Sequence, residues 1–257
     1  MPEVAGMTRD ALVSYLDEYL DPTRDPDYGP NGLQVEGRDR VQRLVLGVSA
    51  CEELFRRAAD WGADAILVHH GLFWEGMPRV VTGPMKRRLA VLLRADINLL
   101  AYHLPLDRHP EVGNNAVAAR ALGLGDLAPF GLYKGKPVGF RGRFPTSVSA
   151  TELVARCRGL FGREPLAFLH GPDPLTTVGI ISGGAQGEVH QAIGAGLDAY
   201  ITGEVSEWVM NLVRESGLHY LAVGHYAGEK VGVLALGQHL AGRFGIDVEF
   251  VDVPNPV

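Results

Sequence analysis

Histidines and carboxylates that directly follow apolar, strand-like runs are the side chains in this sequence best suited to chemistry. They form three clusters: His69 with His70, the segment 102–107 with Asp107 as its candidate ligand, and His225 with Glu229. Imidazole and carboxylate ligands together suit Zn²⁺, Fe²⁺, Mn²⁺ or Ni²⁺ better than Ca²⁺ or Mg²⁺, which prefer oxygen ligands alone. Because the ends of buried strands meet at one sheet edge, the three clusters predict a joint metal site.

The spacing within the clusters favours two metal ions per chain. His69 and His70 are adjacent, and adjacent side chains of a strand point to opposite faces, so they rarely bind one ion. Where the chain leaves the strand, however, such a pair can serve two ions that share one pocket. His225 and Glu229 are four residues apart, which places them on one face of a helical turn. A glutamate can bridge two cations through its two oxygens. The pattern therefore indicates a dinuclear centre.

Each of these residues also has an ordinary structural explanation. Two strand-end histidines commonly bond to the backbone, and Asp107, which follows a proline turn, is suited to a turn or a helix cap. Glu229 lies in the first turn of a predicted helix, where the helix dipole favours an acid. His103 and Glu204 are further candidates, for proton transfer or for supporting the metal ligands, and a purely structural role is the main alternative for both.

The elements that must position these residues follow an α/β pattern. Short runs rich in Val, Ile and Leu alternate with helical patterns, which predicts mixed sheets covered by helices. The predicted strands are Leu44–Val48, Ala65–Val68, Ile97–Tyr102, Thr177–Ile181, Ala199–Thr202 and Tyr220–Val223. Two predicted helices end at a glycine: residues 52–61 at Gly62, and residues 187–195 at Gly196. A third helix is predicted at 116–121, with Asn115 as its N-cap, and a long fourth helix runs from the His225 cluster to Arg243.

Two stretches interrupt this pattern. Residues 127–146 contain Gly and Pro at short intervals, which predicts short, broken strands and a change of subdomain. Residues 170–174, His-Gly-Pro-Asp-Pro, predict a connecting turn, after which a second α/β unit begins. The glycine-rich segment 182–187 offers backbone N–H groups to an anion, although it lacks the ending of a P-loop, and a tight strand-to-helix turn is the alternative.

An internal similarity links the two halves of the chain. Residues 62–74 align without gaps with residues 196–208, and Gly, Asp, Ala and the closing Trp coincide. Each copy follows a strand that contains a glycine, Gly47 or Gly179, and His70 falls opposite Glu204. Any helix-to-strand turn has some of these features, but the match favours a duplicated βαβ unit.

Composition excludes several classes of protein. A formal net charge of −6 argues against binding of nucleic acid through its phosphates. The two cysteines, Cys51 and Cys157, are far apart and form no C-x-x-C motif, so neither a disulfide framework nor a cysteine zinc site is indicated. The N-terminus has no signal-peptide pattern and no apolar stretch is long enough to cross a bilayer, so we expect a cytoplasmic protein.

Several motifs in a fixed order resemble one family. They are Asn-Gly-Leu-Gln-Val at 31–35, Leu-Val-His-His-Gly-Leu-Phe-Trp at 67–74, Tyr-His-Leu-Pro-Leu-Asp at 102–107 with Gly-Asn-Asn at 113–115, and Gly-His-Tyr-Ala-Gly-Glu at 224–229. This set is similar to the NIF-three-like dinuclear-metal-centre family, whose members are often labelled GTP cyclohydrolase I type two homologues. The chain resembles the short bacterial form, and the similarity runs over nearly its whole length.

The resemblance implies an architecture and a ligand set. The five residues of the three clusters would bind two divalent ions, with Glu229 as the bridge. The fold would consist of two intertwined α/β domains, the first formed by residues 1–126 and about 220–257, the second by about 127–219. The chain would assemble with itself into a toroidal homohexamer, a trimer of dimers.

Two kinds of function are compatible with such a centre. The first is a metal-dependent hydrolase that uses a metal-bridging water on a small-molecule substrate. GTP cyclohydrolase-type activity is implied only by the family label, since one fold and one metal site support unrelated reactions. The alternative is a non-catalytic metal-binding hexameric scaffold, or a regulatory or metal-handling protein.

Overall fold

The chain divides into two compact units in a computed structural model that describes residues 6–23 and 27–257. Unit 1 consists of the residues up to Leu106 together with Val233–Pro254, and unit 2 of Asp107–Gly232 with Asn255–Val257. These boundaries differ from the expected ones near residues 127 and 220. The helix at 114–121, just before residue 127, packs on strands of unit 2 and so belongs to that unit. The strand at 219–222 pairs within the unit-2 sheet, so unit 2 extends beyond residue 220.

Unit 1 is built on a mixed sheet with the strand order β13-β4-β5-β6-β2, in which only β2 runs antiparallel to its neighbour. The strands are β2 (Gly32–Val35), β4 (Arg43–Ser49), β5 (Ala65–His70), β6 (Asn98–Ala101) and β13 (Asp247–Phe250), and β1 (Met7–Thr8) pairs with β3 (Arg40–Val41) beside them. The helices are α1 (Arg9–Leu20), α2 (Glu52–Trp61), α3 (Gly83–Ala95) and the second part of α9 (His225–Phe244).

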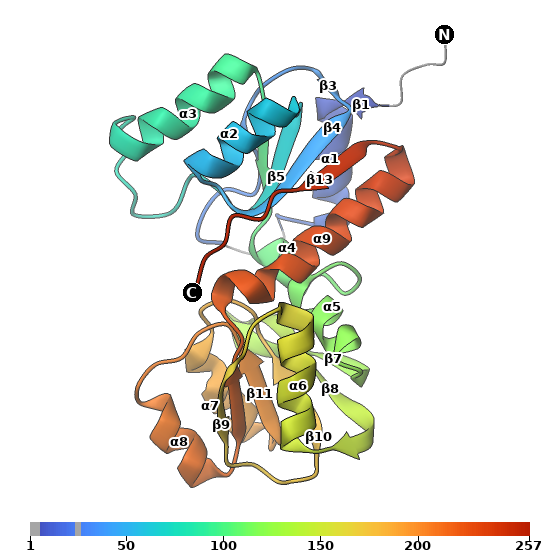
Figure 1. Cartoon of the computed structure of the whole chain (residues 1–257), viewed down its shortest axis with the longest axis vertical. Coiled ribbons are helices and arrows are strands. Elements are labelled where there is room, and N and C mark those ends of the chain that lie inside the picture. Colours follow the sequence, from blue (N-terminus) through green and yellow to red (C-terminus); the bar gives the residue numbers. More distant parts are fainter. Residues whose placement is uncertain (1–5, 24–26) are drawn as a thin grey trace. The chain divides into compact units, whose positions relative to one another are not determined.

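Helices cover both faces of the unit-1 sheet. Figure 1 shows α2 and α3 side by side, and these two helices pack against each other. A side chain at Gly47 of β4 would collide with Leu54 of α2, at 2.5 Å, and one at Gly237 of α9 would collide with Leu46. Because Leu46 and Gly47 are neighbours on one strand, α2 and α9 lie on opposite faces of the sheet.

The start and the end of α2 follow from its sequence. The Sγ atom of Cys51 accepts a hydrogen bond from the backbone of Leu54 at the N-terminus, and acids occupy the first turn. Gly62 ends the helix in the left-handed conformation, with φ of 77°, which glycine adopts without steric cost. The predicted helix 52–61 and its glycine stop are thus confirmed.

Unit 2 is built on a second mixed sheet with the strand order β7-β8-β10-β11-β12-β9. The strands are β7 (Gly125–Tyr133), β8 (Lys136–Val148), β9 (Leu166–Leu169), β10 (Leu175–Ile180), β11 (Ala199–Thr202) and β12 (His219–Ala222). The helices are α5 (Asn114–Ala121), α6 (Ala150–Phe161), α7 (Val189–Gly194), which follows the 3₁₀ turn η1 (Gln186–Glu188), and α8 (Val209–Ser216); α4 (Leu104–Arg108) contains the boundary between the units. Side chains of α5 and α6 join those of β10, β11 and β12 in one apolar core.

The predicted strands and the α/β class are confirmed, but the expectation of short, broken strands at 127–146 is wrong. β7 and β8 form one long antiparallel hairpin closed by Lys134 and Gly135, both at positive φ. Proline is tolerated here because it lies where the sheet needs no N–H donor. Pro129 lies in the edge strand β7, and Pro137 and Pro145 fall outside the residues of β8 that pair in register with β10.

Two helix predictions also need correction. The helix expected at 187–195 is shorter, because residues up to Glu188 form the 3₁₀ turn η1, and the α-helical part ends at Gly194. Asn115 does not cap α5. Gly113 occupies that position, and the buried Asn115 amide instead donates hydrogen bonds to the carbonyl oxygens of Asp107 and Val138.

The two aligned segments fold alike, which supports the duplicated unit. In each, a helix joins two parallel strands, β4 to β5 in unit 1 and β10 to β11 in unit 2. The aspartate shared by both copies, Asp64 or Asp198, accepts two hydrogen bonds from the start of the preceding strand, at 2.9 Å each in unit 1 and 2.8 Å each in unit 2. The donors are the backbone N–H groups of Gln42 and Arg43 in unit 1 and of Thr176 and Thr177 in unit 2.

Candidate metal centre

Unit 1 brings three histidines together, and we call them the histidine cluster: His69 and His70 at the end of β5, and His103 just after β6. One ring nitrogen of each lies within 4.8 Å of the others, a spacing at which the three could hold a metal ion. The ladder of β5 extends through His70, which lies opposite Ser49, and the Ser49 hydroxyl is 3.0 Å from His70 Nδ1. His69 is fully buried. The predicted pair thus lies within the strand, not beyond it.

A backbone carbonyl sets the orientation of His69. Its Nδ1 atom lies 3.1 Å from the carbonyl oxygen of Tyr102, which can only accept, so Nδ1 carries the proton and Nε2 the lone pair. The Tyr102 side chain is fixed in turn, since its hydroxyl donates to Asp17 Oδ1 at 2.6 Å. Burial raises the pKa of Tyr102, so this hydroxyl stays protonated. Such carbonyl–histidine contacts are typical of metal ligands.

His103 is held by a carboxylate that the sequence reasoning missed. The Nδ1 atom of His103 lies 2.6 Å from Oδ1 of Asp27, and Asp27 Oδ2 accepts the amide N–H of Asn31 at 2.9 Å and the backbone N–H of Leu104 at 3.0 Å. Burial would raise the pKa of Asp27, but hydrogen bonding to His103 and its charge outweigh this and lower it. An acid beside the Asn31 motif was the only signal that could have pointed to Asp27.

Unit 2 brings together Asp107, His225 and Glu229, which we call the carboxylate cluster. One carboxylate oxygen of Asp107 lies within 4.8 Å of one of Glu229, and Glu229 Oε2 lies 3.3 Å from His225 Nε2. The exposed fractions of Asp107 and Glu229 are only 6% and 2%. Two buried carboxylates this close repel each other unless positive charge compensates them. The donor set and its charge therefore fit a cation.

Neighbouring polar groups fix the carboxylate of Asp107. Its Oδ1 atom accepts the amide N–H of Asn114 at 2.9 Å and the hydroxyl of Ser182 at 3.0 Å. Asn114 is itself held by α9, because its Oδ1 accepts the backbone N–H of Gly232 at 2.8 Å. The sequence patterns predict Ser182 only as part of the glycine-rich segment 182–187 and give Asn114 no role of its own, so neither could be identified as a support. Asp107 lies inside α4 and is not its cap.

Glu204 contacts the ring of His225, so the structure gives it a positioning role. Glu204 Oε1 lies 2.6 Å from His225 Nδ1, while Nε2 of the same ring faces Glu229. Burial lowers the pKa of His225, but the hydrogen bonds and charges of Glu229 and Glu204 outweigh this effect and raise it to about 9. A carboxylate behind an imidazole is the usual arrangement at a histidine metal ligand.

The glycine-rich segment 182–187 lies against the carboxylate cluster. A Cβ atom at Gly183 would lie 2.6 Å from Glu229 Oε1, and one at Gly184 would lie 3.3 Å from Glu204 Oε1. Gly183 also has a φ of +71°, in the left-handed region. Two carboxylates beside the segment disfavour a bound anion, so its role is a close turn around the cluster.

Comparison with known proteins shows the family of this chain. Residues 7–256 match the family model described as Duf34/NIF3 (NGG1p interacting factor 3). The chain belongs to the DUF34/NIF3 family. A relative from Pseudomonas aeruginosa named "GTP cyclohydrolase 1 type 2 homolog" is 47% identical over 245 residues, which cover 95% of this chain and 97% of the relative. An Escherichia coli K12 protein of the same name is 42% identical over 254 residues, covering 97% and 100%.

Solved structures agree with this family membership. Protein ybgI, described as of unknown function, is 42% identical to this chain with a TM-score of 0.92, and the match covers 98% of this chain and 100% of ybgI. A protein from Thermus thermophilus is 43% identical with a TM-score of 0.90 over the same shares. HcgD from Methanocaldococcus jannaschii, at 22% identity and a TM-score of 0.84, shares the fold. The resemblance that the motifs indicated is confirmed.

Proposed function

We propose that this DUF34/NIF3 protein is a metal-dependent hydrolase that binds two divalent ions through His69, His70, Asp107, His225 and Glu229. The observation that carries the proposal is the buried carboxylate pair, since Asp107 and Glu229 lie within 4.8 Å of each other with an imidazole beside them. His225 can carry one positive charge, but two ionised carboxylates beside it still leave an excess of negative charge, which a divalent cation would neutralise.

The two clusters complement each other chemically. The histidine cluster contributes imidazoles, and the carboxylate cluster contributes two acids and a further imidazole. His103 and Asp107 are only four residues apart, on either side of the point where the chain passes from unit 1 to unit 2. Together the clusters would form the mixed nitrogen and oxygen set that Zn²⁺, Fe²⁺, Mn²⁺ or Ni²⁺ prefers.

The residues of this chain would have different roles in such a hydrolase. When bound, a pair of divalent ions lowers the pKa of water and polarises the bond under attack. Glu229 would bridge the ions, while Asn114 and Ser182 keep Asp107 in one orientation. His103 would exchange a proton with the reacting groups through Nε2, because Asp27 holds its Nδ1.

The substrate proposed first is GTP or a related small molecule. The support is the name carried by the Pseudomonas aeruginosa and Escherichia coli relatives, GTP cyclohydrolase 1 type 2 homolog. A cyclohydrolase of this type would hydrolyse carbon–nitrogen bonds of the purine ring. A screen of the metal-loaded protein should also include phosphoesters and cyclic amides, because a dinuclear centre supports several hydrolytic reactions.

Metal analysis and matched variants test the proposal. Protein purified without chelator should contain close to two equivalents of transition metal per chain, and His69→Ala and Glu229→Ala should each lower this content and abolish turnover. His190→Ala is the control, because this exposed ring stacks on Trp208, outside both clusters. Metal content near zero in every preparation contradicts the centre. Full metal content without turnover of any substrate, with assembly lost on chelation, supports the scaffold alternative instead.

We further propose, on the family likeness, that the chain assembles into a homohexamer. Light scattering should then give a mass six times the 27.7 kDa of the chain. A monomer or dimer at micromolar concentration contradicts this assembly.

A further inference from the structure

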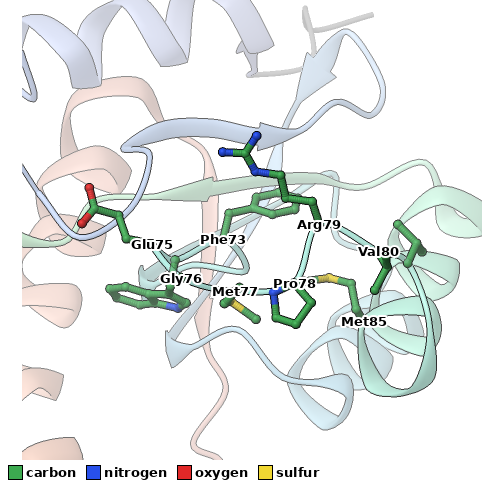
Figure 2. A pocket seen from close by; sticks show the side chains of 10 residues that line it. Phe73, Glu75, Gly76, Met77, Pro78, Arg79, Val80 and Met85 are labelled. Carbon is green, nitrogen blue, oxygen red and sulfur yellow. The ribbon is translucent and has the colours of Figure 1, made fainter.

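The loop between β5 and α3 forms a pocket of about 430 Å³ within unit 1, and its size suits a small organic ligand. Figure 2 shows its lining side chains, which come from residues 73–81 and from Met85 of α3. Most of them are apolar, and several are unusually exposed, with exposed fractions of 38% for Phe73, 40% for Met77 and 58% for Val80. Exposed apolar side chains that gather around a hollow mark a binding site.

Trp74 joins this pocket to the histidine cluster. Its indole lines the pocket, and its ring centroid lies 5.8 Å from that of His70 and 5.0 Å from that of His103, with an edge-to-face angle of 86° to His103. The indole N–H donates to the carbonyl oxygen of Gly71 at 3.1 Å, which fixes the ring. A ligand in the pocket would therefore lie beside His70, a proposed metal ligand, and beside His103, the proposed proton-transfer residue.

The first part of the loop is held rigidly against the segment that contains Asp27. The backbone N–H of Glu75 donates to the carbonyl oxygen of Tyr28 at 2.7 Å. A side chain at Gly29 would collide with the Phe73 carbonyl oxygen, so only glycine permits this approach. The pocket wall next to the histidines is thus preorganised, which reduces the entropy lost on binding.

A positively charged side chain beside the pocket, Arg79, favours an anionic group on the ligand. Arg79 is exposed and makes no ion pair with any residue in the described part of the chain. Figure 2 shows the Arg79 side chain extending over Phe73, with Glu75 at the opposite end of the row of lining residues from Val80 and Met85. A guanidinium binds phosphate or carboxylate groups through paired hydrogen bonds.

We propose that this pocket is the substrate-binding subsite of the protein, and that it takes a flat aromatic or heteroaromatic ring carrying an anionic group. The ring packs on Phe73, Trp74 and Met77, since aromatic and thioether groups pack well against a ring. The anion pairs with Arg79. The inference rests on the proposed hydrolase in that the ring then lies next to the metal centre, but it concerns binding and can be tested without turnover.

Binding of defined probes tests the subsite. Calorimetry on the metal-loaded protein would compare 1-naphthyl phosphate and guanosine 5′-monophosphate with inorganic phosphate and with 2-naphthol. At least one of the two ring phosphates should bind roughly tenfold more tightly than either inorganic phosphate or 2-naphthol, since ring and anion each contribute. Tighter binding of the nucleotide identifies a heteroaromatic ligand, and tighter binding of the naphthyl compound identifies an aryl phosphate.

Matched variants locate the site. Arg79→Gln and Phe73→Ala should each weaken ring-phosphate binding several-fold with metal content unchanged. Arg94→Gln and Leu93→Ala should leave it unchanged, because these exposed residues of α3 lie outside the pocket. Ring phosphates that bind no better than inorganic phosphate, or whose binding survives both pocket variants, overturn the subsite. Normal probe binding with no metal and no turnover instead overturns the hydrolase and leaves the subsite standing.

Discussion

Substitution of Gly183 by alanine should damage the carboxylate cluster more than it damages the fold. The added Cβ would lie 2.6 Å from Glu229 Oε1, whereas ordinary contact begins near 3.4 Å, so the carboxylate must retreat by about 0.8 Å. Metal–ligand distances tolerate only about 0.2 Å of change. The left-handed φ of +71° adds about 1–2 kcal/mol of strain, which lowers the free energy of unfolding.

Two control glycines separate the collision with Glu229 from the backbone strain. Gly196 has a φ of +63° with nothing within 4 Å of its added Cβ, and Gly187 has open space and no positive φ. Gly196→Ala should therefore lose about 1–2 kcal/mol of stability with unchanged metal affinity, and Gly187→Ala should alter neither. Only Gly183→Ala should also weaken metal binding, by about 10- to 100-fold, the range typical when groups around a metal ligand are disturbed.

Urea unfolding of the metal-free variants and competition with a chelator on the metal-loaded variants would measure the two effects. If Gly183→Ala held metal within twofold of Gly196→Ala, then Glu229 would not be a ligand in the position described. If all three variants lost metal equally, general destabilisation would explain the result, and the collision between the added Cβ and Glu229 would not be its cause.

Three further predictions concern single contacts. Glu204→Ala should weaken metal binding about tenfold, because the ring of His225 is then no longer held. Glu204→Gln should weaken metal binding less, since it retains a hydrogen-bond acceptor, and equal losses in the two variants would contradict a positioning role. Asp198→Ala should lower the free energy of unfolding by about 2–3 kcal/mol, because two backbone N–H groups of β10 lose their acceptor, and a loss under about 0.5 kcal/mol in urea melts would refute this. Burial raises the pKa of Cys157 to about 12, so a thiol reagent at pH 8 should label only Cys51 in the native protein and both after unfolding; rapid labelling of Cys157 in the native protein would contradict its burial.

The sequence was most informative where burial is complete. The strands β5 and β11 could be predicted within a residue or two because both their faces are covered, which requires continuous apolar runs. The long hairpin of β7 and β8 could not be predicted, because its prolines are tolerated only at positions that do not pair with β10. Which positions those are depends on the register between β8 and β10, which is set by the tertiary structure. Asn115 satisfies every rule for a helix cap, and only the packing around it shows that its amide is needed inside the unit.

The candidate site shows the same division. Residue type and strand-end position predicted His69, His70 and His225 as candidates, but the single sheet edge expected for them is wrong. β5 belongs to the unit-1 sheet, whereas β12, which precedes His225, belongs to the unit-2 sheet. The residues that hold His103 and Asp107 in place could not be predicted, because Asp27 lies 76 residues before His103 and Ser182 lies 75 residues after Asp107. Such contacts exist only once the chain has folded, and no local pattern encodes them.

The route of the chain between the units sets the order in which they can form during synthesis. Unit 2 is almost one continuous segment, but unit 1 needs Val233–Pro254, which provide the second part of α9 and the strand β13 beside β4. A ribosome adds about 5–20 residues per second, so the face of β4 around Leu46 stays uncovered for on the order of 10 s after its own synthesis. Unit 2 can begin to fold in that interval, because its main segment, Asp107–Gly232, is complete before Val233–Pro254 emerge. The unit-1 sheet, in contrast, exposes an apolar face, and with it a risk of aggregation, until Val233–Pro254 have been made.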